Sequence, residues 1–255
     1  MDTQTLIERL DETLEPGAYA DVDASENGLQ IGAGEGTVER AAFAVDAAVQ
    51  TIDAAADWDA DLLVVHHGLS WGGIDRVTGR TYDRVAGLIE AGIDLYVSHL
   101  PLDGHQELGN AAGIADLLGL QDRSAFGELG PVTVGQRGTL PEPLGISELA
   151  VRLEGALDHG GDGIQVLDVG RDRIEAVAIV TGSGADWYDE ALEADVDAFI
   201  TGEGKGKLYH MARESGIPVF LGGHYATETF GIEALADVVA ELGPETRIIE
   251  APTGL

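Results

Sequence analysis

The chain has 255 residues, of which 46 are acidic and 14 are basic, and its formal net charge is −32. It has no basic stripe that could neutralise phosphates, so nucleic acid is not expected as a partner. The absence of cysteine excludes disulfides, thiolate metal sites and cysteine nucleophiles. Hydrophobic residues make up 44% of the chain, which is enough for a sizeable core.

The acidic residues are spread along the chain and do not form one block. This distribution favours adaptation to a high-salt cytoplasm, where screening weakens self-repulsion, over an acidic tail that binds a partner. No apolar stretch approaches the ~18–20 residues of a membrane span. The N-terminus is acidic where a signal peptide would be basic. We therefore expect a soluble, cytoplasmic protein without membrane contact.

Short apolar runs alternate with segments of helical period in the first half of the chain, which is typical of an α/β protein. The alanine-rich segment 38–56 has one apolar face at helical spacing and is predicted to be a long helix. Further helices are predicted at 5–14, 81–91 and 110–118, and buried strands at 62–65 and 94–98.

The second half continues this alternation after a less regular middle segment, in which His159 lies in a glycine-rich turn. Strands are predicted at 132–134, 165–169, 174–180, 197–201 and 218–221, and helices at 147–157, 186–194, 207–215 and 226–242. We predict one unit over 1–255 with two lobes, a metal-binding lobe of 1–124 plus 220–255 and a second lobe of 125–219. The expected fold class is α/β, with mixed, mostly parallel sheets flanked by helices.

Polar residues follow most of the predicted core strands directly. In open α/β sheets, ligands bind beyond the carboxyl ends of the strands, so these loops mark the expected site between the lobes. The loops are His66–His67, His99–Asp103, Thr181–Gly184, Thr201–Glu203 and Gly222–His224.

Three histidines and two carboxylates in and next to these loops have the side chains of a metal site: His66, His67, Asp103, His224 and Glu228. Neighbouring side chains of an extended segment point to opposite faces, so His66 and His67 would flank two ions and would not easily grip one. Glu228 lies four residues after His224, on the same face of a helical turn, and can bridge two ions. The alternative for this pair is a helix cap with a carboxylate at the helix N-terminus.

The donor set consists of nitrogen and oxygen only, which suits zinc, manganese, iron, cobalt or nickel. Three neutral imidazoles and two carboxylates would leave two divalent ions with a residual charge of about +2 and open coordination positions. Such a centre attracts anions and activates water near neutral pH. The sequence therefore predicts two divalent ions per chain and hydrolysis of a small anionic metabolite.

Four further features have two or more interpretations each. His99 is a further ligand, a general base or a residue that orients a ligand. Glu203 is a general base or an acid at the start of a helix. The glycine loop at Thr181–Gly184 is an anion-binding loop or a structural turn. Trp71 packs in the core or forms the wall of a pocket.

Several motifs together resemble the Nif-three-like (Ngg-interacting-factor-like) dinuclear-metal family, whose members are often labelled GTP cyclohydrolase I type 2 homologues. The resemblance covers nearly the whole chain and follows the family order. The matching segments are 27–32 (NGLQIG), 64–68 (VVHHG), 98–110 (SHLPLDGHQELGN), 201–203 (TGE) and 222–228 (GGHYATE). The chain departs from the family at Ser25-Glu26, where many members have Trp-Asp, and at Ser70, where an aromatic residue is common.

The resemblance implies a two-lobed α/β fold of the compact form. It also implies a di-metal centre formed by His66, His67, Asp103, His224 and Glu228, and a toroidal homohexamer. We expect a metal-dependent hydrolase of a small phosphorylated or nucleotide-like metabolite, with His99 and Glu203 as catalytic residues. The alternatives are a GTP cyclohydrolase and a non-catalytic metal-binding, metal-trafficking or scaffold hexamer.

Overall fold

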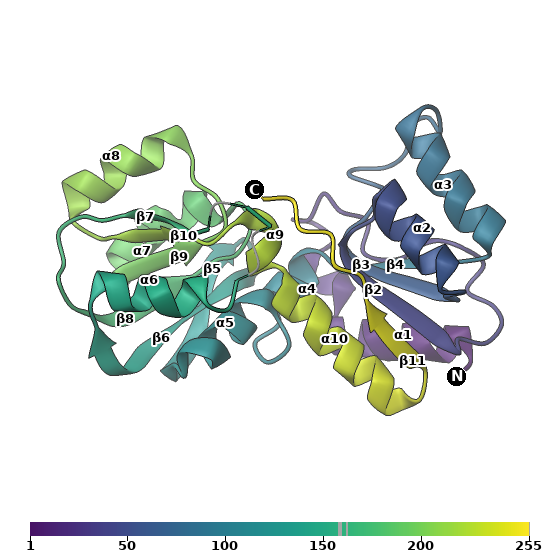
Figure 1. Cartoon of the computed structure of the whole chain (residues 1–255), viewed down its shortest axis with the longest axis horizontal. Helices are drawn as coiled ribbons and strands as arrows, with labels where there is room; N and C mark the ends of the chain where they lie inside the picture. The colour runs from purple at the N-terminus through teal and green to yellow at the C-terminus, as the bar shows by residue number, and fades with distance from the viewer. Residues whose placement is uncertain (158–159, 162, 255) are drawn as a thin grey trace. The chain divides into compact units, whose positions relative to one another are not determined.

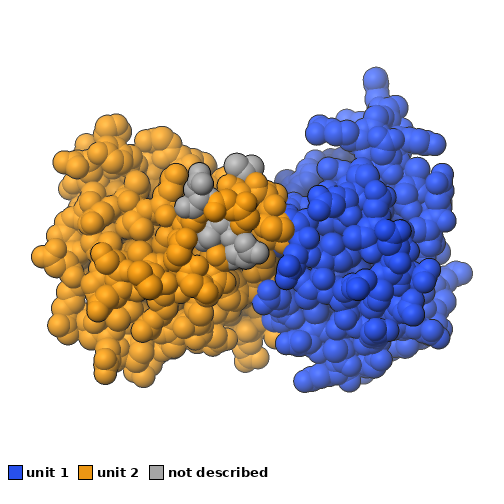
Figure 2. Space-filling view, in the orientation of Figure 1, with its two compact units in different colours: residues 1–102, 231–251 blue, residues 103–230, 252–255 orange. Residues whose placement is uncertain are grey.

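The computed structural model describes residues 1–157, 160–161 and 163–254. His159 lies outside the described residues. The chain divides into two compact units, the first of residues 1–102 and 231–251 and the second of residues 103–230 and 252–255 (Figure 2). Segments 103–124 and 220–230, which the sequence analysis assigned to the metal-binding lobe, thus belong to the second unit.

The first unit is built on a five-stranded sheet of order β1-β4-β3-β2-β11 (Figure 1). Strands β4, β3, β2 and β11 are parallel to one another, and β1 pairs antiparallel with β4. The strands are β1 (Gly28–Ile31), β2 (Arg40–Asp46), β3 (Leu62–His67), β4 (Asp94–Val97) and β11 (Glu245–Ile248).

Helices cover both faces of this sheet. Alternate residues of β2, β3 and β4 pack with Ile52, Ala55 and Leu88 of the helices α2 and α3 in one apolar cluster. On the other face the Tyr96 hydroxyl donates to Asp11 Oδ1 of α1, at 2.8 Å. The helical segments are α1 (Thr3–Leu14), η1 (Pro16–Tyr19), α2 (Val49–Asp57) and α3 (Arg80–Ala91), together with α4 (Leu100–Gly104) and α10 (Thr229–Leu242), each of which has two residues in the second unit.

The long helix predicted over 38–56 is wrong in its first half. Residues Arg40–Asp46 form β2, and the helix α2 begins only at Val49. Strand β2 lies inside the sheet with Ala41, Ala42 and Phe43 fully buried, so neither face alternates with polar residues. A strand that is buried on both faces has a continuous apolar sequence. Because the alanines of β2 have a high helix propensity, this sequence by itself predicts a helix.

The second unit has a six-stranded sheet of order β5-β6-β8-β9-β10-β7. Its central strands β8, β9 and β10 are parallel, whereas the other three pairings are antiparallel. The two-lobed α/β class is confirmed, although parallel pairing dominates only the first sheet. The strands are β5 (Gln121–Leu129), β6 (Val132–Leu144), β7 (Gln165–Leu167), β8 (Ile174–Ile179), β9 (Ala198–Thr201) and β10 (Val219–Leu221).

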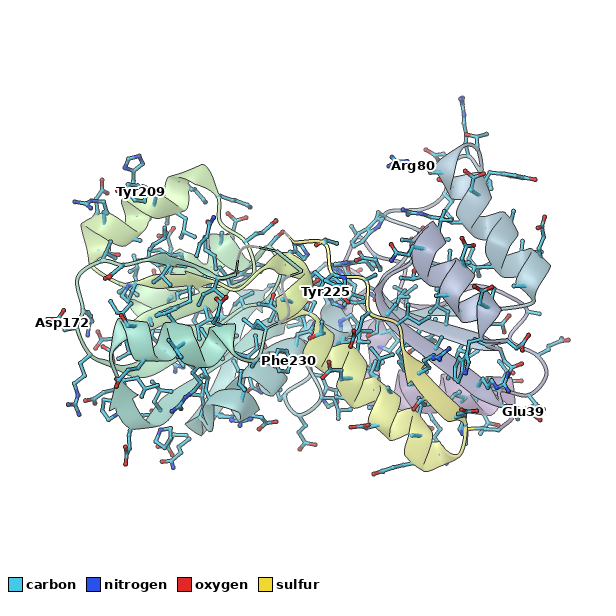
Figure 3. The ribbon with its side chains drawn as sticks, in the orientation of Figure 1. Glu39, Arg80, Asp172, Tyr209, Tyr225 and Phe230 are labelled. Atoms are coloured by element: carbon cyan, nitrogen blue, oxygen red, sulfur yellow. The ribbon has the colours of Figure 1, made fainter. Side chains whose placement is uncertain are left out.

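One apolar cluster of the second unit lies between this sheet and the helices α5 and α6. Ile114, Leu149 and Phe220 are fully buried in it, and Phe230 packs against it (Figure 3). The helical segments are α5 (Asn110–Leu118), α6 (Ile146–Glu154), η2 (Gly184–Trp187), α7 (Tyr188–Glu193), α8 (Gly206–Ser215) and α9 (His224–Thr227).

The last predicted helix, 226–242, is divided at Glu228. Helix α9 ends at Thr227 and α10 begins at Thr229, and the Glu228 amide donates to the Tyr225 carbonyl instead of continuing the α-helical pattern. The break leaves the Glu228 side chain buried, with 3% exposed. Within the described ranges, none of these helices combines the length and the apolar character needed to cross a membrane.

Candidate metal centre

The carboxyl ends of β3 and β4 bring three histidines of the first unit together. The two strands are parallel neighbours, so His66 and His67 at the end of β3 lie beside His99, just after β4. The His66 ring centroid lies 4.7 Å from that of His67 and 5.1 Å from that of His99, and the His67 and His99 centroids are 5.7 Å apart. The side chain of His66 is completely buried, and the other two are 18% and 20% exposed.

Each of the three imidazoles has an oxygen acceptor at Nδ1. His66 Nδ1 lies 2.9 Å from the Ser98 carbonyl oxygen, His67 Nδ1 3.0 Å from Asp46 Oδ1, and His99 Nδ1 2.8 Å from Asp23 Oδ1. A carbonyl or an ionised carboxylate only accepts, so the proton of each neutral ring is at Nδ1 and the lone pair is at Nε2. An acceptor at one nitrogen is the usual arrangement of a histidine that binds metal through the other.

These three residues fit the requirements of a metal site. Each offers one ring nitrogen, and the three nitrogens lie within 4.8 Å of one another. This closeness speaks against the expectation that His66 and His67 would not easily grip one ion. Alternation along a strand fixes only the direction in which each Cβ leaves the backbone, and the rings reach beyond that point to lie 4.7 Å apart.

Two acidic residues that orient these histidines were not predicted. Asp46 ends β2 and pairs in register with His67. This neighbour could not be predicted, because the segment was expected to be a helix. Asp23 lies in the turns after η1, and its side chain is 1% exposed. Burial raises the pKa of Asp23, but hydrogen bonds from His99, Asn27 and the Ser25 amide hold this pKa below its usual value. Asp23 therefore accepts as a carboxylate.

Trp71 lies against this histidine cluster and is not part of the core. Its side chain is 48% exposed. Its ring centroid lies 5.0 Å from that of His99, in a T-shaped arrangement, and 6.0 Å from that of His67. Core packing is thus excluded for this residue, and a position beside the candidate ligands is shown.

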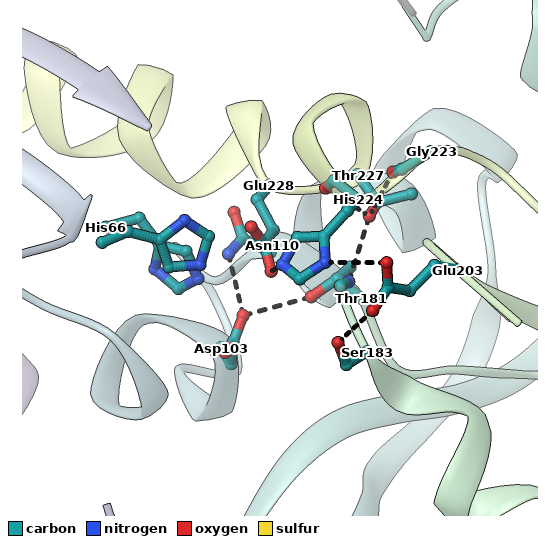
Figure 4. A network of polar contacts seen from close by, with 12 residues as sticks. His66, Asp103, Asn110, Thr181, Ser183, Glu203, Gly223, His224, Thr227 and Glu228 are labelled. Carbon is teal, nitrogen blue, oxygen red and sulfur yellow. Dashed lines mark hydrogen bonds and ion pairs between the residues drawn. The ribbon is translucent and has the colours of Figure 1, made fainter. Parts of the chain in front are cut away.

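In the second unit, the loops after the parallel strands β8, β9 and β10 come together in the same way (Figure 4). They carry Thr181–Gly184, Thr201–Glu203 and Gly222–His224. The five strand-end loops of the sequence analysis therefore belong to two sheets, with two loops at the first and three at the second.

His224 lies between two carboxylates of the second unit. Its Nε2 is 3.3 Å from Glu228 Oε1, and its Nδ1 is 3.5 Å from Glu203 Oε2 (Figure 4). Burial lowers the pKa of His224, but Glu228 and Glu203 raise it more strongly, to about 9. Without a metal the imidazole is thus protonated at neutral pH, and an ion bound at Nε2 would have to displace that proton.

Asp103 is held at one carboxylate oxygen by two neighbours. The Asn110 amide donates to Asp103 Oδ1 at 2.8 Å, and the Thr181 hydroxyl donates to the same atom at 3.1 Å (Figure 4). Asp103 is 8% exposed, and Asn110 is completely buried. These contacts fix the orientation of a carboxylate, as neighbours of a metal-ligating carboxylate do.

The glycine loop at Thr181–Gly184 packs against these side chains, and one of its amides is already engaged within the protein. The Gly182 amide already donates to the Thr227 hydroxyl, and the Gly182 carbonyl accepts from the Glu203 amide. Gly182 has a φ of +54°, and a Cβ on it would lie 2.1 Å from Glu228 Oε1 and 3.2 Å from His224 Nε2. These contacts of Gly182 favour the structural turn over the anion-binding loop.

The structure thus brings predicted site residues together within each unit. His66, His67 and His99 belong to the first unit, and Glu203, His224 and Glu228 form a chain of contacts in the second. Glu203 also accepts a hydrogen bond of 2.5 Å from the Ser183 hydroxyl, a contact that its position alone did not predict. The first group offers nitrogen donors and the second offers nitrogen and oxygen donors, which are the donor types that first-row divalent metals prefer.

Comparison with known proteins relates the whole chain to one family. The family model described as Duf34/NIF3 (NGG1p interacting factor 3) matches residues 1–252. A protein of Halobacterium salinarum named GTP cyclohydrolase 1 type 2 homolog is 56% identical, over 100% of both chains. The crystal structure of a Thermus thermophilus protein aligns with a TM-score of 0.89 and 37% identity, over 100% of both chains. The structure of the protein ybgI, of unknown function, aligns equally well at 34% identity.

Proposed function

Because the chain belongs to the Duf34/NIF3 family, we propose that it is a hydrolase that depends on divalent metal ions and acts on a small anionic metabolite, phosphorylated or nucleotide-like. The proposed ligands of two ions are His66, His67, Asp103, His224 and Glu228. The observation that carries the proposal is the orientation of the histidines in the first unit, whose Nδ1 atoms all face oxygen acceptors. A purely structural cluster would not need the same nitrogen fixed three times.

Bound divalent ions would supply Lewis-acid activation of water and positive charge for an anionic substrate. The chain itself would supply the proton transfers. His99 is oriented by Asp23 and can exchange a proton at Nε2, while the half-exposed Glu203 can do so at its carboxylate. Both residues are proposed as catalytic, and His99 is also placed to serve as a further ligand.

The names of the relatives favour a second candidate within the same enzyme class. Several of them, from Halobacterium salinarum to Escherichia coli, are named GTP cyclohydrolase 1 type 2 homolog. Ring opening of GTP would give a product of the formamidopyrimidine or dihydroneopterin type. This candidate differs from phosphate-ester hydrolysis in the bond that is broken, so product analysis separates the two.

Metal content per chain, measured by elemental mass spectrometry in high potassium chloride, tests the metal centre first. We expect about two ions in the wild type and loss of metal in His67→Ala and Glu228→Ala. His210→Ala, on the exposed side of α8 next to Tyr209 (Figure 3), is the matched control and should keep the wild-type content. Absence of metal from supplemented wild-type protein would contradict the proposal.

A screen of nucleotides and phosphate esters with the preferred ion then tests the hydrolase activity. Turnover that requires the metal and is lost in Glu203→Gln or His99→Gln would support the assigned roles. Bound metal without turnover of any compound would favour metal storage or a scaffold. We also propose a homohexamer, which light scattering tests through the mass in solution.

A further inference from the structure

The exposed tryptophan beside the histidine cluster has no structural task that explains its position. Of the three tryptophans in the chain, all of them among the described residues, Trp58 has the guanidinium groups of Arg40 and Arg247 over its ring, and the Trp187 indole donates to the Glu128 carbonyl. Of these three side chains, Trp71 alone is about half exposed, at 48%. Leaving a large indole half in water forgoes much of the free energy that its burial would contribute.

The backbone around Trp71 is fixed on both sides. Trp71 forms an isolated antiparallel bridge with Ser25, in which the Gly72 amide donates to the Ala24 carbonyl at 2.6 Å and the Glu26 amide to the Ser70 carbonyl at 3.3 Å. The preceding amides of Leu69 and Ser70 both donate to Gln30 Oε1. An exposed aromatic side chain on such a fixed backbone is preorganised, so less entropy is lost when it binds a ligand.

The contact with the histidines leaves part of the indole surface uncovered. The rings of Trp71 and His99 are T-shaped, with an interplanar angle of 78° and centroids 5.0 Å apart. An edge-to-face contact uses an edge of one ring, in contrast to a stack that would cover a whole face. The Trp71 ring is therefore both next to a candidate catalytic histidine and accessible from solvent.

We propose that Trp71 is a substrate-positioning residue that stacks on a planar heteroaromatic ring, such as a purine or a pterin, and holds it beside His99. This inference rests on the proposed function, because it names the substrate class of that site. A flat aromatic side chain with an exposed surface can bind a planar heteroaromatic ring by stacking. Such stacking contributes measurably to affinity and does not depend on which base is bound. A substrate that is only a sugar phosphate would not need this surface.

The test uses the full-length chain carrying Trp58→Phe and Trp187→Phe, so that Trp71 is the sole tryptophan. Guanosine 5′-monophosphate is titrated, and its binding is followed by tryptophan fluorescence and by calorimetry. Ribose 5-phosphate, which has the same sugar phosphate and no heteroaromatic base, is the matched probe. We expect saturable quenching by the nucleotide only, and weakening of its binding by about 10- to 100-fold in Trp71→Leu. Trp71→Phe should retain most of the affinity.

Metal content, measured on the same samples, separates this inference from the proposed function. Normal metal content with equal nucleotide affinity in wild type and Trp71→Leu would overturn the stacking role and leave the metal centre intact. Loss of metal from Trp71→Leu would overturn it too, since the residue would then support the ligands. A change in oligomeric mass without a change in nucleotide affinity would identify Trp71 as a contact between copies of the chain, which also contradicts the inference.

Discussion

The histidines of the two units differ in their hydrogen-bond partners and in their protonation. In the first unit, His66, His67 and His99 each have an oxygen acceptor at Nδ1, which leaves Nε2 with a lone pair. In the second unit, His224 has carboxylates near both ring nitrogens, and its pKa rises to about 9. In the proposed metal centre, the first set would coordinate without losing a proton, whereas His224 would exchange a proton for a metal ion. The contacts therefore fix the tautomer of the histidines in the first unit and the charge of His224 in the second.

Among the variants that test this comparison, removal of one imidazole from the first unit should have the largest effect, a loss of bound metal. We expect His66→Ala to lose at least the ion that the first-unit histidines bind, because a buried ring that provides a nitrogen donor is deleted. Elemental mass spectrometry after dialysis measures the content, with His210→Ala as control. Wild-type content in His66→Ala would show that this set does not hold metal.

Gly182→Ala should disturb the second unit alone. The new methyl group would lie 2.1 Å from Glu228 Oε1, on a backbone with a φ of +54°. We expect a loss of about 2–4 kcal/mol in the free energy of unfolding, measured by chemical denaturation. Gly206→Ala is the matched control, since a Cβ there meets nothing within 4 Å. Equal stability of the two variants would contradict the close packing of this loop.

Replacing the acceptors of the first unit should weaken its metal binding without removing a ligand. We expect Asp23→Asn and Asp46→Asn to reduce metal affinity by about 10- to 100-fold, because the tautomer of the ligand is no longer fixed. Competition with a chelator measures this affinity. The effect should be larger for Asp23, which is 1% exposed, than for Asp46, which is 37% exposed. The reverse order would argue against orientation by buried acceptors.

The ion pairs of His224 in the second unit predict that the stability of the metal-free protein depends weakly on pH. The pKa of His224 rises from 6.5 in the unfolded chain to about 9 in the folded one. The stabilisation is complete below pH 6.5 and disappears as the pH rises through 9. We expect a loss on the order of 1 kcal/mol over this window, measured by denaturant unfolding. Glu228→Gln should flatten the profile, and an unchanged profile would contradict the ion pair.

The positions of the candidate ligands could be predicted because strand ends are marked in the sequence by apolar runs followed by polar residues. That pattern located His66, His67, His99 and His224 correctly at the ends of β3, β4 and β10. It also identified Thr201–Glu203 at the end of β9. The signal is local, and therefore one sequence was sufficient to find these loops.

The residues that orient the ligands could not be predicted, because their relation to the site is formed by distant segments. Asp23 is 76 positions from His99, and Asp46 reaches His67 only through the register of β2 and β3. Thr181 is 78 positions from Asp103. The exposure of Trp71 likewise depends on the segment around Ser25, to which its backbone is bonded.

The order of the chain through the two units has a consequence for folding. The first unit takes residues 1–102 and 231–251, and its edge strand β11 pairs in parallel with β2, about 200 positions earlier. On the ribosome, β2, β3 and β4 therefore emerge long before β11 and the helix α10 can join them. Closing so long a loop is entropically costly and slows folding. The second unit is continuous from 103 to 230 and can fold first, so we expect the first unit to be the later one to form and the one that benefits most from a chaperone.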